Sequence, residues 1–358
     1  MGPGWTPSVR MLWNWLLAYS LVSLLKTPSI RAAETDAKPG DADNVSVPTM
    51  EWDNGIGREN FQGITNNSSC SDVLAWLPAR SIPAVVFQVV SEHYVALEEN
   101  FISNMELHST FSRENLYLVC LDTKSVSYFE ALGIPCVRYY CMDCNVTRPK
   151  IWVLRVEVAK CLLSSGHDVL MSDADAVWIH DPVDDFASHE YRDSNIVGSR
   201  GTRPLALSGK WGSSICMGFA LFRAGGNAMQ VFMTVTGEFA KELGDDQIAV
   251  NEALNELGVI WDPTSDMGFR NSTRPGTGMI HNITSIHGDG DSLKVSLLPH
   301  SKYPRRCLQY GKHKTISNLT VVAHCLSKEK GEPMAAWMKE EDLWNLPDRA
   351  PDPNLRHI

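Results

Sequence analysis

Apolar runs alternate with helical patterns from residue 83 onward. Segments of continuous apolar character, typical of strands buried on both faces, lie at 84–90, 116–121 and 135–140. Segments with apolar residues at helical spacing lie at 94–105, 126–132 and 149–164. This alternation predicts an α/β fold in which a mostly parallel central sheet is flanked by helices.

The segment 149–164 carries its apolar residues on one stripe, which is expected to leave Arg155 and Lys160 off the core. Pro149 at its start and Gly166 just past its end are residues that favour these two helix boundaries. A short apolar run, Val169 to Met171, follows and predicts another buried strand.

Two acids, Asp173 and Asp175, come directly after this strand. Residues two apart in extended backbone point to the same side, so the two carboxylates can converge on one point. Isolated carboxylates beside an apolar strand are costly, and a divalent cation with oxygen preference would compensate them. The alternative is a polar turn with both acids in water. The strand end favours a ligand site, because open α/β sheets bind ligands beyond the carboxyl ends of their strands.

The N-terminal region lacks this alternation of apolar and helical patterns. An apolar run of about 15 residues, from Met11 to Leu25, lies between the lengths of a signal-peptide core and a membrane-spanning helix. Residues 1–31 therefore predict a signal anchor or a signal peptide, and residues 32–80 predict a largely disordered stem or linker. The folded domain is expected at 81–348, followed by a tail at 349–358.

Composition narrows the class of protein. The chain of 358 residues is 44% hydrophobic and 21% charged, which is ordinary for a globular protein. A formal charge of −10 with no basic tract argues against a nucleic-acid partner. An anionic ligand would need local cations or a metal.

Glycosylation sequons and cysteines indicate the secretory pathway. Nine cysteines fit an oxidising lumen and leave at least one unpaired. The cluster Cys136, Cys141 and Cys144 has no nearby histidine, so a disulfide-pinned loop is expected rather than a zinc site. The N-x-S/T triplets begin at Asn44, Asn66, Asn67, Asn145, Asn271, Asn282 and Asn318.

Several motifs occur in a specific order over roughly residues 83–346. They include FQVVSEHYVALEENFISNMEL, DVLMSDADAVWIHDP, CMGFALFRAGG, DDQIAVNEAL and VVAHCLSKEKG. Together they resemble the nucleotide-diphospho-sugar transferases of plants and algae, a family that includes retaining arabinosyl-, xylosyl- and galactosyltransferases of the secretory pathway.

The resemblance implies a GT-A fold, a nucleotide-sugar donor such as a UDP-sugar, a glycan or glycoprotein acceptor, and Mn²⁺ or Mg²⁺. It also implies a type II protein of the Golgi or ER membrane with a lumenal catalytic domain, or a secreted protein if the N-terminal segment is cleaved. A leaving diphosphate needs electrostatic stabilisation, which a metal held by the acids would supply.

The resemblance places a third metal ligand at His324, beside Asp173 and Asp175. Asp175 is expected to bind the metal directly, and Asp173 to contact metal-bound water or the ribose. A structural histidine is the alternative for His324. The residues expected to contact the nucleotide sugar are Ser91, Asp122, Arg155, Lys160, Asp173, Gly218 and Lys330.

Each of these contacts has a simpler alternative. Arg155 and Lys160 could be solvated helix charges, and Ser91 and Asp122 could serve as caps or turn residues. Asp246 and Gln247 are the expected catalytic residues, because a retaining transfer needs a carboxylate or amide near an oxocarbenium-like centre. They could instead belong to a helix N-terminus that an aspartate caps.

Three features depart from the family pattern. Cys216 stands where a polar residue such as Asn often precedes the glycine, Pro333–Met334 stand where a lysine is expected, and HGDGDSLK has no counterpart. Two other functions remain open. One is a haloacid-dehalogenase-like phosphatase with Asp173 as nucleophile and Asp175 as general acid. The other is an inactive, glycan-binding relative.

Overall fold

The structure, a computed structural model, describes residues 63–77, 84–140, 146–270, 272–284, 290–305, 308–309, 313–314, 317–324, 332–340 and 343–346. The predicted anchor at 1–31, the tail at 349–358 and Lys330 lie outside these ranges. Within them, no helix combines the length and apolarity needed to cross a membrane.

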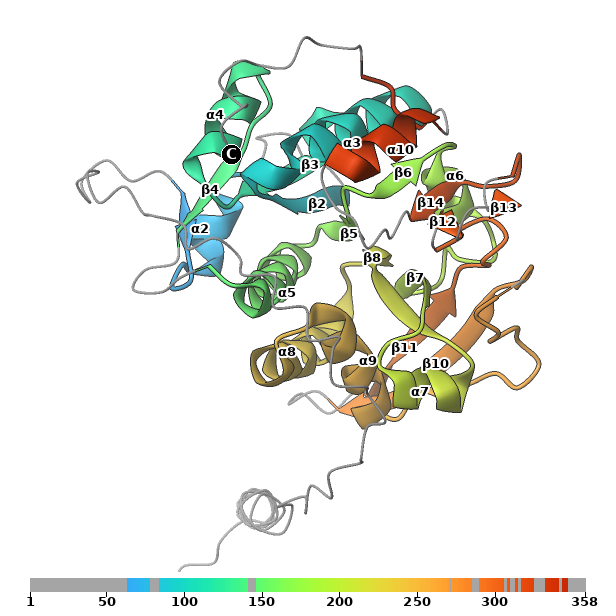
Figure 1. Cartoon of the computed structure of the whole chain (residues 1–358). Coiled ribbons are helices and arrows are strands. Elements are labelled where there is room, and N and C mark those ends of the chain that lie inside the picture. The colour runs from blue at the N-terminus through green and yellow to red at the C-terminus, as the bar shows by residue number, and fades with distance from the viewer. Residues whose placement is uncertain are drawn as a thin grey trace, which may run out of the picture. The chain divides into compact units, whose positions relative to one another are not determined.

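A ten-stranded sheet forms the centre of the described unit (Figure 1). Its strands are β1 (Ile64–Thr65), β2 (Ala84–Val90), β3 (Leu116–Cys120), β4 (Val137–Tyr140), β5 (Asp168–Ser172), β7 (Ile196–Gly201), β8 (Ser214–Phe222), β9 (Ile260–Trp261), β10 (Gly276–Thr284) and β11 (Gly290–Leu297). Their order across the sheet is β1-β4-β3-β2-β5-β8-β7-β11-β10-β9.

Direction divides the sheet into two parts. The neighbours from β1 to β5 are all parallel, as is β7 with β11. The pairs β5–β8, β7–β8, β10–β11 and β9–β10 are antiparallel. Five of the nine pairs are therefore parallel, and the predicted α/β fold with a mostly parallel sheet is confirmed.

Helices cover both faces of this sheet. The α-helices are α2 (Cys70–Leu74), α3 (Val95–His108), α4 (Thr123–Ala131), α5 (Arg148–Ser164), α6 (Pro182–Ala187), α7 (Leu205–Trp211), α8 (Gly226–Leu243), α9 (Asp246–Glu256) and α10 (Glu332–Glu340). Two 3-10 turns, η2 (Glu92–Tyr94) and η3 (Arg113–Asn115), precede α3 and β3.

The alternating side chains of β2 explain the two hydrophobic cores. Val85 and Phe87 pack in one core with residues of α5, α8 and α9, whereas Val86 and Val90 pack in the other with residues of α3, α4 and α6. Because both faces are covered, β2 needs apolar residues at nearly every position. Figure 1 shows α5, α8 and α9 on one side of the sheet and α3 and α4 on the other.

Smaller sheets lie outside the main one. In the first, β6 (Ala176–Trp178) pairs antiparallel with β14 (Val322–His324), so that Ala176 lies opposite His324. This pair packs against α3 and α10, which lie side by side, and Val177 and Ala323 join Leu97 in a small apolar core (Figure 1). In the second, β12 (Leu308–Gln309) pairs with β13 (His313–Lys314). The first pairing brings a late segment of the chain to the end of β5.

One sequence-based expectation needs correction. Residues 63–77, predicted as part of a stem, join the folded unit: β1 pairs with β4, Val73 is buried, and a disulfide links Cys70 to Cys161. The expected disulfide at Cys136, rather than a zinc site, is confirmed, and its partner is Cys120. Cys141 and Cys144 lie outside the described residues.

Other expectations were close. The predicted helices at 94–105, 126–132 and 149–164 correspond to α3, α4 and α5, with α4 beginning three residues earlier because Asp122 caps it. In the motif HGDGDSLK, which had no counterpart in the family, residues 290–294 belong to β11.

Candidate functional site

The two acids of the DxD motif lie in a tight turn at the carboxyl end of β5. The backbone N–H of Asp173 donates to Gly218 O of β8 at 2.9 Å, and Ala176 N–H donates to Asp173 O at 2.8 Å. The turn connects β5 to β6 with one residue between the carboxylates. Asp175 is buried, whereas the side chain of Asp173 is 31% exposed. The sequence prediction that these acids converge at a strand end is consistent with this turn.

The pairing of β14 with β6 places His324 against both acids. Its Nε2 lies 3.2 Å from Oδ1 of Asp175 and 3.6 Å from Oδ2 of Asp173. One ligand atom from each of the three residues lies within 4.8 Å of the other two. His324 is only 3% exposed. These residues are separated by about 150 positions in the sequence, and the sheet register brings them together.

The donor set fits a divalent cation. Nε2 of His324 is buried and faces the carboxylates of Asp175 and Asp173. Burial opposes protonation of this imidazole, but the carboxylate of Asp175 and the neighbouring Cys216 raise the pKa of His324 to about 10. A buried nitrogen aimed at two carboxylates, with oxygen and nitrogen donors in one cluster, suits Mn²⁺ or Mg²⁺ coordination.

Gly218 supports the histidine ring. A Cβ at this position would lie 1.9 Å from Cε1 of His324, so any side chain would displace the ring. The carbonyl of Gly218 also accepts the hydrogen bond from Asp173. The sequence placed Gly218 among the sugar-nucleotide contacts, and the structure places it under His324 and the acid turn.

Arg155 is a buried link between two acids. Its Nη2 lies 3.0 Å from Oδ1 of Asp173, and its Nη1 lies 3.1 Å from Oδ2 of Asp246. Nη2 also donates to Met217 O at 3.3 Å. The expectation that Arg155 lies off the core is wrong, since the residue is 5% exposed. The face of α5 that appeared polar packs against the site instead of facing water.

The pKa values of both groups in this link are raised. Burial lowers the pKa of Arg155, but Asp246 and Asp173 outweigh it, so the net shift is upward. Burial also raises the pKa of Asp246 to about 6, although Arg155 opposes the shift. Arg155 therefore keeps two neighbouring carboxylates compatible with burial.

Gln247 and Asp246 face different neighbours at the start of α9. Asp245, not Asp246, caps this helix by accepting from Ile248 N–H at 2.8 Å. Asp246 is thereby left to pair with Arg155. Gln247 donates from Nε2 to Arg203 O at 3.0 Å, close to Gly201 at the end of β7.

The remaining predicted contacts are more distant or have structural tasks. Asp122 caps α4 through Ser125 N–H and also accepts from Glu92 N–H at 2.8 Å. Ser91 precedes the η2 turn at the end of β2. Lys160 makes no ion pair or side-chain hydrogen bond within the described part of the chain.

Three further residues near the site were not among the predicted site residues, although Cys216 was noted as a departure from the family pattern. Cys216 lies with its Sγ 3.6 Å from Nδ1 of His324, on the ring edge opposite Nε2. The backbone of Arg305 bridges to His324, and its guanidinium lies beside Gly201. Glu98 of α3 is fully buried, and burial together with the charge of Asp173 raises its pKa to about 8.

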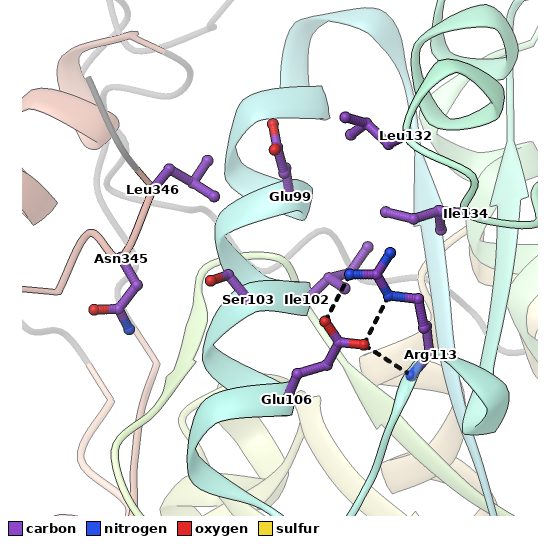
Figure 2. Close-up of a pocket in the computed structure, with 9 residues that line it drawn as sticks. All are labelled: Glu99, Ile102, Ser103, Glu106, Arg113, Leu132, Ile134, Asn345 and Leu346. Atoms are coloured by element: carbon purple, nitrogen blue, oxygen red, sulfur yellow. Dashed lines mark hydrogen bonds and ion pairs between the residues drawn. The ribbon is translucent and has the colours of Figure 1, made fainter. Parts of the chain in front are cut away.

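A hollow of about 360 Å³ lies elsewhere, on the outer side of α3. Figure 2 shows its lining, which contains none of the residues of the acid cluster. Arg113 from η3 reaches Glu106 of α3 there with two hydrogen bonds of 2.7 and 2.9 Å. Its charged side chains already have partners, because Arg113 pairs with Glu106 and Glu99 accepts a hydrogen bond from Tyr128, so the hollow is the weaker candidate for chemistry. The lining residues are Glu99, Ile102, Ser103, Glu106, Arg113, Leu132, Ile134, Asn345 and Leu346.

The strand ends of this α/β sheet carry an acid turn, a histidine that could be a third metal ligand, and a buried arginine. This arrangement is suited to binding a diphosphate through a metal. The family model of the nucleotide-diphospho-sugar transferases matches residues 112–330, which is more than half of the chain. The chain belongs to this family, and the sequence-based assignment is confirmed.

Solved structures with similar folds are glycosyltransferases of low sequence identity. The glycosyltransferase GlyE of Streptococcus pneumoniae is 13% identical, with 75% of this chain and 66% of that chain covered and a TM-score of 0.40. The WbbM bifunctional glycosyltransferase is 11% identical over 71% of this chain and 47% of that chain, also with a TM-score of 0.40.

The galactosyltransferase LgtC, solved with donor and acceptor sugar analogues, is 10% identical over 74% of this chain and 97% of that chain, with a TM-score of 0.37. This chain thus spans about half of WbbM and just under two thirds of GlyE. No curated protein matches the sequence significantly.

Proposed function

We propose that the protein is a metal-dependent glycosyltransferase that moves a sugar from a nucleotide-diphosphate donor, such as a UDP-sugar, to a glycan or glycoprotein acceptor. The convergence of Asp173, Asp175 and His324 within 4.8 Å supports this function most directly. Asp175 and His324 approach each other most closely, which agrees with Asp175 as the direct ligand.

The metal would be Mn²⁺ or Mg²⁺, held by Asp173, Asp175 and His324. When bound, it would stabilise the negative charge that develops on the leaving diphosphate. Gly218 leaves room for the imidazole ring, and Arg155 fixes the orientation of Asp173. These two residues prepare the ligand set before the donor arrives, which is the electrostatic preorganisation that catalysis requires.

The donor sugar would lie toward α9. The carboxylate of Asp246 and the amide of Gln247 would stabilise positive charge near the anomeric carbon in a transfer that retains configuration. Asp246 is held by Arg155 and Gln247 by the carbonyl of Arg203, so both side chains have fixed positions.

A lumenal location in the Golgi or ER accords with this function. The sequon asparagines that the structure describes, Asn66, Asn67, Asn282 and Asn318, are all exposed and open to glycosylation. Treatment of the expressed chain with an N-glycosidase should lower its apparent mass, and protease protection of intact vesicles should show the catalytic unit inside. A chain that shows neither effect would contradict the location but not the activity.

Asp175→Asn tests the activity. Loss of a metal ligand removes several kcal/mol of transition-state stabilisation, roughly a thousandfold in rate. Mn²⁺-dependent hydrolysis of UDP-sugars should fall by this order, together with the Mn²⁺-dependent rise in melting temperature. Asp193→Asn is the matched control, because the side chain of Asp193 is 69% exposed.

Unchanged UDP-sugar hydrolysis in Asp175→Asn would overturn the metal assignment. The phosphatase alternative makes a different prediction: Mg²⁺-dependent cleavage of a phosphate monoester with no binding of nucleoside diphosphates. An inactive relative would bind glycans and show neither reaction. Measuring all three on the same preparation distinguishes the hypotheses.

A further inference from the structure

Arg305 is held in place by the segment that carries it. Pro304 O accepts a hydrogen bond from His324 N–H at 3.0 Å, and Arg305 bridges to His324 through the backbone. Two residues earlier, the hydroxyl of Tyr303 donates to Asp185 at 2.9 Å. Arg305 is therefore fixed to the same strand as the histidine of the metal cluster.

The guanidinium of Arg305 meets two other polar side chains around Gly201. A Cβ on Gly201 would lie 3.2 Å from Nη1 of Arg305, 3.2 Å from Nε2 of Gln247 and 3.1 Å from Oγ of Ser214. Glycine at this position therefore lets the three groups converge. Two of them already have an acceptor, since Gln247 and Ser214 both donate to Arg203 O.

The side chain of Arg305 has no such acceptor in the part of the chain that the structure describes. Its Nε is buried without a hydrogen bond, and the guanidinium forms no ion pair within the described residues. Other buried or half-buried arginines of the sheet region have partners. Arg155 pairs with two acids, Arg223 lies 3.5 Å from Asp168, and Arg200 donates to backbone carbonyls. A buried donor on a cation is costly when it is left unmatched, so a ligand that supplies an acceptor would be favoured.

The position of Arg305 favours the sugar over the diphosphate. Its Nη1 lies beside Gly201, which pairs with Ser214 of β8, two residues before Cys216. Cys216 lies at Nδ1 of His324, whereas Asp173 and Asp175 lie at Nε2 on the other edge of the ring. Gln247, the residue expected beside the reacting centre, approaches Gly201 as closely as Arg305 does. We therefore expect the Arg305 guanidinium to face an anionic group other than the diphosphate, next to the transferred sugar.

We propose that Arg305 binds the carboxylate of a uronic acid, so that the substrate of this transferase is an acidic sugar. The carboxylate is on the donor sugar or on the acceptor residue next to it. This inference rests on the proposed transferase function. The planar fork of arginine matches a carboxylate with two parallel hydrogen bonds. In a chain with a net charge of −10, such a substrate needs a local cation of this kind.

The test uses the full chain with Mn²⁺ and calorimetric titration of UDP, UDP-glucose, UDP-glucuronate and UDP-galacturonate. If the donor carries the acid, a UDP-uronate should bind at least about tenfold more tightly than UDP-glucose. Arg305→Gln should abolish that preference and leave the affinity for UDP unchanged, and Arg305→Lys should retain part of it. Arg192→Gln, at a side chain that is 65% exposed, is the control.

If the acceptor carries the acid, the donors bind alike, but an acidic oligosaccharide should accelerate consumption of a neutral UDP-sugar and a neutral oligosaccharide should not. Arg305→Gln should remove that acceleration. Absence of any preference for an acid in both arms, or an equal loss of UDP affinity in Arg305→Gln, would overturn the assignment of Arg305. Failure of the wild-type chain to bind UDP at all would instead refute the transferase function. Melting temperatures without ligand confirm that each variant is folded.

Discussion

Two buried arginines, Arg155 in α5 and Arg200 in β7, are stabilised in different ways. Arg155 lies between the carboxylates of Asp173 and Asp246, which raise its pKa despite burial. Arg200 is completely buried and has no acid within ion-pair distance in the described part of the chain. Burial lowers the pKa of Arg200 to about 10, because its partners carry no charge.

The carbonyl partners of Arg200 come from two separate segments. Its guanidinium donates to Leu298 O at 2.9 Å, Gly268 O at 2.9 Å and Arg274 O at 3.0 Å. It therefore holds the loop before β10 and the residue after β11 against β7. The guanidinium of Arg155 thus neutralises acids in the site, whereas that of Arg200 satisfies backbone carbonyls that would otherwise be buried and unpaired.

Arg155→Met should have the largest effect, because it leaves Asp246 as an uncompensated buried charge. Removing one partner of a buried ion pair costs about 3–5 kcal/mol. The free energy of unfolding, measured with urea, should fall by that amount, and UDP-sugar turnover should be lost. Arg155→Met combined with Asp246→Asn should recover most of the stability without the activity. A double variant no more stable than the single one would show that the buried charge of Asp246 does not cause the loss of stability.

Arg200→Met should cost less, about 1–3 kcal/mol, since the unpaired carbonyls are destabilising but an uncompensated cation is also removed. No second substitution should rescue it, because its partners are backbone atoms. Limited proteolysis should cut the segment around Gly268 faster than in the wild type, while the KM for the donor should change little. A donor-binding defect with unchanged proteolysis would contradict a purely structural role.

Glu98→Gln should raise stability, and the size of the gain should depend on pH. Burial and Asp173 raise the pKa of Glu98 to about 8, and neither carboxyl oxygen has a hydrogen-bond partner in the part of the chain described. The unfolded chain ionises this group from about pH 4.5, but the folded chain does so only near pH 8, so wild-type stability falls between these values. The variant lacks this loss. Its advantage over the wild type in free energy of unfolding should therefore grow by at least about 1 kcal/mol from pH 5 to pH 8. Urea unfolding with EDTA at both pH values measures it, and an equal gain at both would contradict the shifted pKa.

These residues show which parts of the molecule the sequence could predict. Strands β2, β3 and β5 were readable because burial on both faces requires nearly continuous apolar runs. β11 was missed because it begins in a polar stretch, and its place depends on pairing with β7 and β10. Local periodicity carries no information about such distant partners.

The same limit applied to the site. Asp173 and Asp175 were predicted from their spacing and their place at a strand end. His324 came only through the family resemblance, because its contact with them depends on the pairing of β14 with β6. Arg155 was misplaced for the same reason: its polar helix face has two acids from other elements as partners. A charged residue on a helix appears solvated until its tertiary partners are known.

Arg113→Ala extends the comparison to an arginine at the surface and should have the smallest effect. Arg113 makes two hydrogen bonds to Glu106 in the hollow of Figure 2, but its side chain is 46% exposed and that of Glu106 is 30% exposed. Water and salt screen such a pair, so the expected loss is below about 1 kcal/mol and should shrink further in 1 M NaCl. Glu106→Ala is the matched control and should give a similar loss. A loss as large as that of Arg155→Met would mean that two good hydrogen bonds, rather than burial of the charges, decide what an arginine pair contributes in this protein.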